Sequence, residues 1–228
     1  MMNPELKRKL STYTARDHVY ETLRERIVTL ALEPGRVISE KEISEALQVS
    51  RTPVREAFVK LAQEELLEVY PQRGTYVSLI DLRHVEEARF IREHLERAAA
   101  REACVAFSEA STADLLRIAS EQRVAAERGD DAALFRLDEA FHRAIAVGSG
   151  KSRIWTVLEQ MNVHLSRIRM LSVTAKADWD AIVAQHERIA EAIRAKDADR
   201  ADRAMEAHLK KLLFEQDELK LAYPQYFK

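Results

Sequence analysis

An aspartate and three histidines in the second half of the chain carry the most distinctive chemistry of the sequence. Asp138 and His142 are four residues apart, so in a helix their side chains stack on one face. Apolar residues one turn away place that face, and the faces that carry His186 and His208, toward the interior. Buried polar side chains are costly unless satisfied, and one metal ion would satisfy all four. Alternatively, each histidine is a separate core residue with its own hydrogen-bond partner, as the similarly placed His164 illustrates.

A second group of residues points to nucleic acid. Arg51 and Arg55 lie four residues apart at the start of a predicted helix, so their side chains share one side. Arginine can make two hydrogen bonds to O6 and N7 of guanine in the major groove. Ser50 and Thr52 can bind phosphates, assisted by the N-terminus of the helix. The alternative is that both arginines are ordinary surface ion-pair partners.

Two short helices joined by a tight turn would position these arginines. Ser39 followed by Glu42 is the pattern of a capping box and predicts the start of the first helix. Ser50 or Thr52 can cap the second helix, and Pro53 falls in its first turn, where a missing N–H is tolerated. The predicted buried stripe of the second helix consists of Val54, Phe58 and Leu61. This arrangement predicts a helix-turn-helix.

A β-hairpin is predicted directly after the two helices. Residues 67–70 and 75–77 have the composition of strands, and Pro71 to Gly74 has that of a turn. A hairpin in this position is a wing, with Arg73 and Gly74 at its tip. Gly74 permits a positive φ or a close approach of the backbone to a partner. We expect the tip to reach the adjacent minor groove or the DNA backbone.

Composition limits the class of protein. A length of 228 residues predicts one or two domains, and five Gly with five Pro favour long helices. The net charge is −2, and the first 80 residues hold twelve basic and twelve acidic residues, so any DNA contact needs locally placed charge. The single cysteine excludes a disulfide framework and suits a reducing cytosol. No apolar run in the sequence is long enough to span a membrane, and the first residues do not have the pattern of a signal peptide. We therefore expect a cytoplasmic protein without a membrane partner.

The other segments carry helix signals. Asp17 can cap a helix that Glu33-Pro-Gly35 would end. Beyond Asp81 the predicted helices cover residues 81–107, 111–129, 131–147, 152–171, 178–195 and 197–220. The apolar side of the first of these consists of Val85, Ala88, Ile91, Leu95 and Ala98. Six helices with short connections predict an antiparallel bundle.

Two short runs carry a resemblance to a known family. The runs Ser50-Arg-Thr-Pro-Val-Arg-Glu-Ala57 and Arg73-Gly-Thr-Tyr-Val77 resemble the winged-helix domain of GntR-type bacterial transcription regulators, over roughly residues 15–78. The resemblance implies that Lys41 contacts a phosphate. Residues 81–228 look like the all-helical effector domain, called FCD, of the FadR-like branch. The implied fold is mainly α, with a winged helix-turn-helix domain at 1–78 and a helical bundle at 79–228. Independently of the resemblance, we expect residues 1–14 to form a loose arm.

The resemblance also bears on the aspartate and the histidines. Metal-binding FCD domains carry an Asp-x-x-x-His pair, then one histidine on the next-to-last helix and one on the last. The matching residues here are Asp138, His142, His186 and His208. The resemblance therefore favours a metal site over separate core histidines. Such ligands suit Zn, Ni, Mn or Fe, with Zn as the first expectation.

An effector site is implied on the first helix of the same domain. Arg92 matches a family arginine that faces the pocket and can pair with an acid ligand through its planar fork. Arg89, three residues earlier, is a weaker candidate. The alternative for both arginines is a solvated helix face.

The sequence thus predicts a transcription regulator and not an enzyme. It would bind a near-palindromic double-stranded operator as a homodimer, act as a repressor, and respond to a small carboxylate effector beside the metal. One alternative is a metal-dependent, hydrolase-like enzyme, although no further residue stands out as a general base. The other is a regulator whose metal is purely structural and which has no effector.

Overall fold

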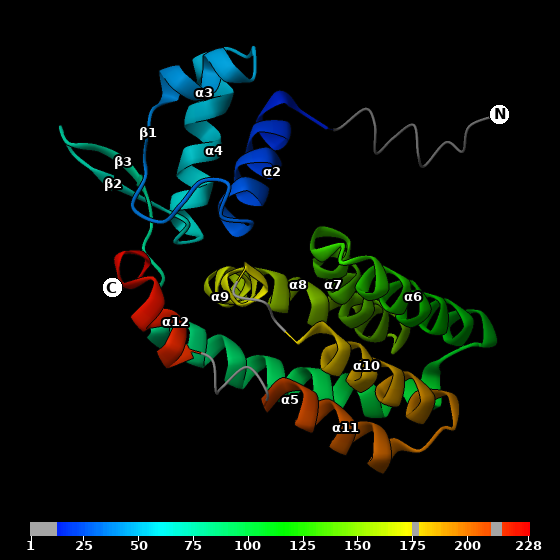
Figure 1. Cartoon of the computed structure of the whole chain (residues 1–228). Coiled ribbons are helices and arrows are strands. Elements are labelled where there is room, and N and C mark those ends of the chain that lie inside the picture. The colour runs from blue at the N-terminus through cyan, green and yellow to red at the C-terminus, as the bar shows by residue number, and fades with distance from the viewer. Residues whose placement is uncertain (1–12, 175–177, 211–215) are drawn as a thin grey trace. The chain divides into compact units, whose positions relative to one another are not determined.

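The computed structural model describes residues 13–174, 178–210 and 216–228 and divides the chain into two compact units (Figure 1). The first unit is Met1–Asp81 together with Tyr223–Lys228, and the second is Leu82–Ala222. Sequence patterning assigns the last six residues to the second domain, whereas the structure places them in the first. The reason is backbone pairing, since the Ile80 amide donates to the Tyr226 carbonyl at 2.8 Å and the Lys228 amide donates to the Ile80 carbonyl at 3.2 Å. The expected loose arm at 1–14 lies, apart from its last two residues, outside the described residues.

The first unit is built around three helices, α2 (Ala15–Val28), α3 (Glu40–Ala46) and α4 (Arg51–Gln63). Helix α4 packs against both α2 and α3, as Figure 1 shows. Its buried face includes the predicted stripe of Val54, Phe58 and Leu61. Burial of this stripe leaves the opposite face of α4, and its first turn, on the surface.

Local hydrogen bonds explain where these helices begin. Ser39 caps α3 as predicted, because its Oγ accepts from the Glu42 amide at 3.1 Å. The prediction that Asp17 caps α2 was wrong: the cap is Thr14, and Asp17 lies at the third helical position. The Thr14 hydroxyl accepts from the Asp17 amide while the Asp17 carboxylate accepts from the Thr14 amide, which completes a capping box. Helix α2 also ends earlier than predicted, at Val28.

A small antiparallel sheet completes the first unit. Its strands are β1 (Val37–Ile38), β2 (Leu67–Tyr70) and β3 (Gly74–Val77), in the order β1-β3-β2. Strands β2 and β3 form the predicted hairpin, with Tyr70 paired to Gly74 next to the turn. Gly74 has a φ of 117°, a backbone angle that residues with a side chain rarely adopt. The hairpin therefore depends on a glycine at this position.

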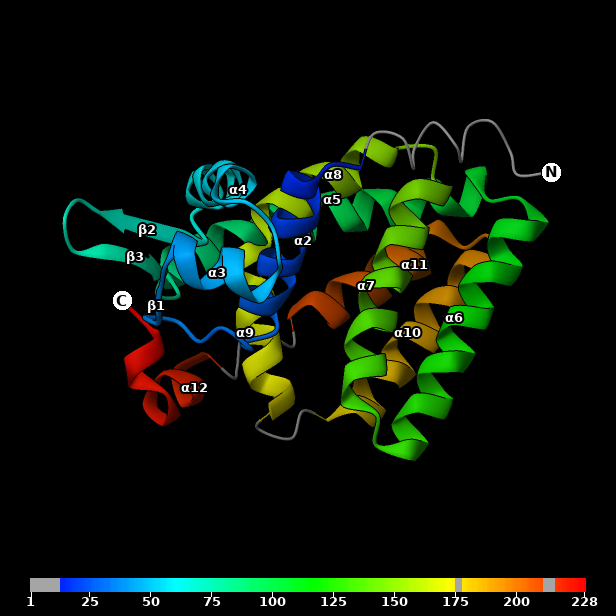
Figure 2. The same cartoon turned by 90° about the horizontal axis from the view of Figure 1, so that it is seen from above.

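The second unit is entirely helical in the part of the chain that the structure describes. Its helices are α5 (Leu82–Ala106), α6 (Glu109–Arg128), α7 (Asp131–Gly148), α8 (Ser152–Met161), α9 (Val163–Thr174), α10 (Trp179–Arg194), α11 (Ala198–Lys210) and α12 (Gln216–Ala222). Helices α7 and α10 both pack against α6, as Figure 2 shows, and α11 packs against α10 and α5. The predicted class, a mainly helical protein with a winged helix and a helical bundle, is confirmed. None of the described helices is long and apolar enough to cross a membrane.

Three details of the bundle differ from the prediction. The helix expected over 152–171 is two helices, α8 and α9, with a break at Asn162. The helix expected over 197–220 ends as α11 at Lys210, and α12 begins at Gln216, after residues that the structure does not describe. Helix α6 begins at Glu109, before the predicted start at 111, because the Ser108 hydroxyl accepts from the Ser111 amide and caps the helix. The predicted count of about six helices is thus too low.

The main core of the second unit is formed by α5, α6, α7, α10 and α11. Alanines on α5 such as Ala99 and Ala103 allow close packing against α11, and Phe141 and Ile189 are fully buried. These packed helices fix the backbone positions from which the polar side chains of the interior project.

Candidate metal centre and nucleic-acid interface

Three helices of the second unit bring the four predicted ligands together. Helix α7 supplies Asp138 and His142, α10 supplies His186 and α11 supplies His208. All four side chains are buried, and one potential ligand atom from each lies within 4.8 Å of the others. The structure therefore gathers every residue that the sequence proposed for the site.

The imidazole rings converge through the same nitrogen. Nε2 of His208 lies 3.2 Å from Nε2 of His142 and 3.2 Å from Nε2 of His186. The Asp138 carboxylate adds oxygen atoms 3.7 Å from Nε2 of His186 and 4.0 Å from Nε2 of His142. The atoms thus surround one small volume.

The hydrogen bond of His186 shows which of its nitrogens carries the proton. Nδ1 of His186 lies 2.7 Å from Oε1 of Gln122. The orientation of that amide is fixed from its other side, because Nε2 of Gln122 donates to the Leu137 carbonyl at 2.9 Å. A carbonyl oxygen can only accept, so Nδ1 of His186 is the protonated nitrogen. Its Nε2 therefore presents a bare lone pair to the centre.

The other two histidines are held in the same tautomer. Nδ1 of His142 contacts the Glu96 carboxylate, and Nδ1 of His208 lies 3.0 Å from Oε1 of Gln185. Both partners are acceptors, so both Nδ1 atoms donate and both Nε2 atoms are unprotonated. Three lone pairs then face one another without a hydrogen between them, an arrangement that a cation would stabilise.

Burial sets the charge of these groups. Burial lowers the pKa of His142, and it lowers the pKa values of His186 and His208 well below the usual range of histidine. The imidazoles are therefore neutral, as metal ligation requires. Burial would raise the pKa of Glu96, but the adjacent Arg92 and His142 outweigh it and hold that pKa well below its usual range.

This donor set fits a divalent transition metal. Neutral imidazole nitrogens with one carboxylate suit Zn, Ni, Mn or Fe, and such nitrogens bind Zn at about 2.0–2.1 Å. Two ligand nitrogens of one ion then lie roughly 3 Å apart by geometry, close to the 3.2 Å separations found here. Partners that accept from the other ring nitrogen are typical of metal-bound histidines. The chain's own residues thus fit the metal that the sequence predicted.

The two arginines proposed for effector binding lie in different environments. Arg92 is 2% exposed; its Nε donates to Glu96, and its buried Nη1 has no hydrogen-bond partner among the described residues. Arg89 is partly exposed and pairs with Glu93 at 3.6 Å, and its buried Nε also has no hydrogen-bond partner among the described residues. An unpaired buried guanidinium nitrogen is costly, so Arg92 has an unfilled requirement for an acceptor.

Four partners of the cluster were missed by sequence analysis. They are Glu96, Gln122, Gln185 and Arg169, the last of which contacts the Asp138 carboxylate. Glu96 could have been found, because it lies four residues after Arg92 and so stacks on it in a helix. No sequence pattern marks the other three, because each of them contacts a residue on a different helix.

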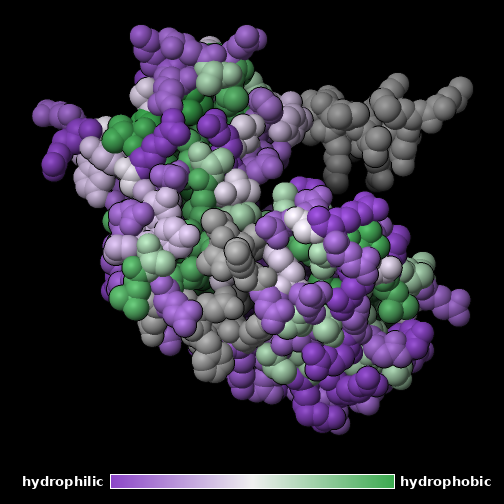
Figure 3. Space-filling view, viewed as in Figure 1, coloured by the Kyte–Doolittle hydropathy of each residue, from purple (hydrophilic) through white to green (hydrophobic). Residues whose placement is uncertain are grey.

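The residues proposed for DNA contact lie on the surface of the first unit. Ser50, Arg51, Thr52 and Arg55 are exposed at the start of α4, and Lys41 is exposed on α3. Hydrophilic residues cover the α3 end of this unit in Figure 3. Arg55 is 70% exposed and pairs with Glu40 at 3.0 Å. The proposed contacts on these helices are thus accessible to a partner.

The wing presents the remaining two proposed contacts. Arg73 and Gly74 are exposed at the end of the hairpin. The turn is closed by a hydrogen bond of 3.0 Å from the Arg73 amide to the Tyr70 carbonyl. The Tyr76 hydroxyl donates to the Arg73 carbonyl at 3.2 Å. These bonds hold the Arg73 backbone in place while its side chain extends into solvent.

Comparison with known proteins assigns both halves of the chain. Residues 15–77 match the family described as "Bacterial regulatory proteins, gntR family", and residues 87–211 match the FCD domain. The HTH-type transcriptional repressor RspR of Escherichia coli (strain K12) is 35% identical over 201 residues, or 88% of each chain. An HTH-type transcriptional regulator of Streptomyces ambofaciens is 35% identical over 214 residues, or 94% of this chain and 90% of the relative.

A solved structure supports the same fold. E. coli McbR/YncC superposes with a TM-score of 0.80 at 24% identity, over 92% of this chain and 99% of that one. The family and the relatives are transcription regulators and not enzymes, which disfavours the metal-dependent hydrolase. The chain belongs to the GntR family of bacterial regulatory proteins and is a DNA-binding transcription regulator with an FCD domain.

Proposed function

We propose that the protein is a one-component repressor that binds operator DNA through its winged helix and senses a small organic acid at a metal in the FCD domain. One observation supports the proposed sensing function of the FCD domain. The unprotonated Nε2 atoms of three histidines meet beside the Asp138 carboxylate, and the nearby Arg92 has an unpaired Nη1. Its place of action would be the bacterial cytoplasm, where the operator is found.

The acid site would use the metal and the arginine together. Asp138, His142, His186 and His208 would hold the ion, which when bound supplies positive charge and, if octahedral, two open coordination positions. Arg92 would bind a second oxygen of the same acid through its unpaired Nη1. Glu96 keeps Arg92 in place because it accepts from Nε of that guanidinium. Arg89 would contribute less, because its side chain is more exposed than that of Arg92 and solvent weakens its interactions with an acid.

On the DNA side, the helices and the wing would divide the contacts. Arg51 and Arg55 would contact guanine edges in the major groove, while Lys41, Ser50 and Thr52 would bind phosphates. Arg73 and Gly74 would reach the neighbouring minor groove or backbone. Two such heads in a homodimer would match a near-palindromic operator, because protein symmetry must match the two half-sites. The acid would act by favouring one arrangement of the two heads over another.

The DNA contacts are tested by Arg55→Ala. We expect the variant to lose about 1–3 kcal/mol of operator affinity, roughly fivefold to 150-fold, which is the usual value of a bidentate contact. The probe is the tightest-binding duplex selected from a randomised library by the wild-type protein, measured by fluorescence anisotropy. Arg194→Ala is the matched control, because Arg194 is 57% exposed and lies in the second unit. Equal binding by Arg55→Ala and wild type would refute the proposed contact.

The acid site is tested by titration calorimetry of the zinc-loaded protein with a panel of sugar acids and dicarboxylates. We expect at least one class of acid to bind, and Arg92→Lys to weaken it about tenfold or more, since lysine cannot reproduce the planar fork. Arg89→Lys should change the affinity much less. If every acid fails to bind while operator binding is retained, the metal is structural and the alternative without an effector is correct.

A further inference from the structure

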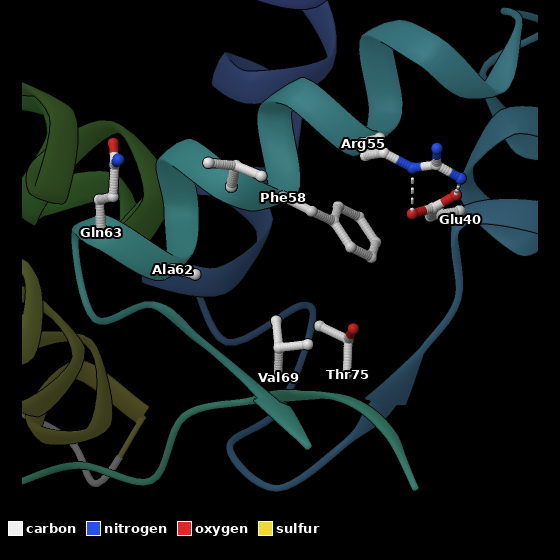
Figure 4. Close-up of a pocket in the computed structure, with 8 residues that line it drawn as sticks. Glu40, Arg55, Phe58, Ala62, Gln63, Val69 and Thr75 are labelled. Atoms are coloured by element: carbon white, nitrogen blue, oxygen red, sulfur yellow. Dashed lines mark hydrogen bonds and ion pairs between the residues drawn. The ribbon is translucent and has the colours of Figure 1, made fainter. Parts of the chain in front are cut away.

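Glu40 makes the closest contact to a proposed base-contacting arginine. It occupies the first position of α3, fifteen residues before Arg55 on α4. Nε and Nη2 of Arg55 donate to the two carboxylate oxygens of Glu40, each at 3.0 Å, as Figure 4 shows. Both side chains are accessible, with 70% of Arg55 and 32% of Glu40 exposed. The contact therefore lies on the surface that would meet DNA.

The two-point contact leaves a defined part of the guanidinium free. The planar group has five N–H donors in a fixed geometry. Glu40 takes the donors on the side edge, at Nε and Nη2. The end edge, formed by Nη1 and the remaining hydrogen of Nη2, can still make two parallel hydrogen bonds to O6 and N7 of guanine. Glu40 thus fixes the direction in which Arg55 would present its remaining donors.

The groups around Glu40 keep its carboxylate ionised and close to the arginines. The hollow beside the pair has a volume of about 500 Å³ and is lined mainly by apolar groups, and in Figure 4 Phe58 of α4 points toward Val69 and Thr75 of the sheet. Hydrogen bonding to Arg55 lowers the pKa of Glu40, and the charge of Arg51 adds to this effect. Glu40 is therefore an anion beside two cations on a surface proposed to face phosphates.

From this geometry we propose that Glu40 is a specificity-determining residue: it orients Arg55 toward guanine and reduces attraction to DNA of any sequence. This inference rests on the proposed role of Arg55 in operator binding. An unrestrained arginine can turn toward any nearby phosphate, which carries no sequence information. A carboxylate at the same place also offsets part of the charge that drives non-specific binding. Glu40 would therefore lower affinity and raise discrimination at the same time.

The test compares three duplexes: the library-selected duplex, the same duplex with the Arg55-dependent guanine replaced by adenine, and a random duplex. Glu40→Gln should bind the random duplex roughly threefold more tightly, the scale of one exposed charge interaction. Its preference for guanine over adenine should fall at least about fivefold, a substantial part of a bidentate contact. Glu40→Asp keeps the charge but is too short for the two-point contact. It should lose discrimination without tighter binding to random DNA.

Glu45→Gln is the matched control, since Glu45 lies on the same helix, is 67% exposed and does not contact Arg55. It removes the same charge and should leave the preference for guanine unchanged. Suppose that Arg55→Ala loses the preference for guanine, while Glu40→Gln keeps the wild-type preference and unfolding temperature. The inference about Glu40 would then be wrong, and the proposed role of Arg55 would stand. If Arg55→Ala keeps the preference, the proposed role of Arg55 and this inference both fail.

Discussion

Replacing His208 with alanine should lower the affinity of the protein for zinc by at least about a hundredfold. Loss of a residue that merely orients a metal ligand costs about 10–100-fold, and loss of a ligand itself should cost no less. His208 stands between the other two imidazoles, with its Nε2 3.2 Å from both. Without it, His142 and His186 would have only Asp138 as a third ligand.

Metal content after dialysis, measured by plasma mass spectrometry, gives the first readout. Thermal unfolding gives the second, because a ligand that binds only the folded state stabilises it by about 2.7 kcal/mol at a hundred times its dissociation constant. Zinc should raise the unfolding temperature of the wild type and not that of His208→Ala. His94→Ala is the control, since His94 is exposed on α5 and lies outside the cluster. Wild-type zinc content in His208→Ala would disprove the site.

Local signals were sufficient to predict most of the first unit. Ser39 caps a helix, Pro53 suits only the first turn of a helix, and Gly74 permits a positive φ. Few other residues can replace them, so their positions show where the helices begin and where the hairpin turns. The break at Asn162 has no such signal, because neither glycine nor proline marks it. The cap at Thr14 was missed because Asp17 is also a good cap residue, although the spacing of Thr14 and Asp17 is the same capping-box pattern that identified Ser39.

The ligands could be predicted from sequence, while the residues that hold them could not. Asp138 and His142 are linked by helical spacing, and the order of the later histidines matched the family. Apolar periodicity chose Ile91 and Leu95 as the inward face of α5, but both are only partly buried, whereas Arg92 and Glu96 are buried. Charged residues usually lie in solvent, so a pattern of apolar residues cannot reveal a buried ion pair.

His164 shows the same limit from the other side. It is as buried as His142, and apolar residues flank it in its helix as they flank the three ligand histidines. Its Nδ1 contacts Arg167 at 2.7 Å, and it does not join the four-residue cluster. Which inward histidines meet is decided by the packing of α7, α10 and α11, and that packing is not encoded in the stripe of any single helix.

Acidification should destabilise the metal-free protein steeply below about pH 6.5, the usual pKa of histidine in an unfolded chain. In the folded protein, burial lowers the pKa values of His142, His186 and His208, so these imidazoles stay neutral as the pH falls. The unfolded state then binds up to three more protons than the folded state. Unfolding free energy therefore decreases with falling pH, by at most about 4 kcal/mol per pH unit when all three differ fully. The loss begins at the unfolded pKa and continues toward the lowered folded values.

Urea unfolding of the chelator-treated protein at pH 7.5, 6.5 and 5.5 measures this slope. Glu96 does not contribute in this window, because its pKa is lowered below the usual range of glutamate and it remains ionised in both states. His208→Ala removes one of the three titrating groups, so its slope should be about two-thirds that of the wild type. Arg194→Ala, which changes an exposed residue outside the cluster and keeps every histidine, should keep the wild-type slope. Equal stability at pH 7.5 and 5.5 would show that the three imidazoles take up protons over the same pH range in the folded and the unfolded protein, which would contradict the lowered pKa values.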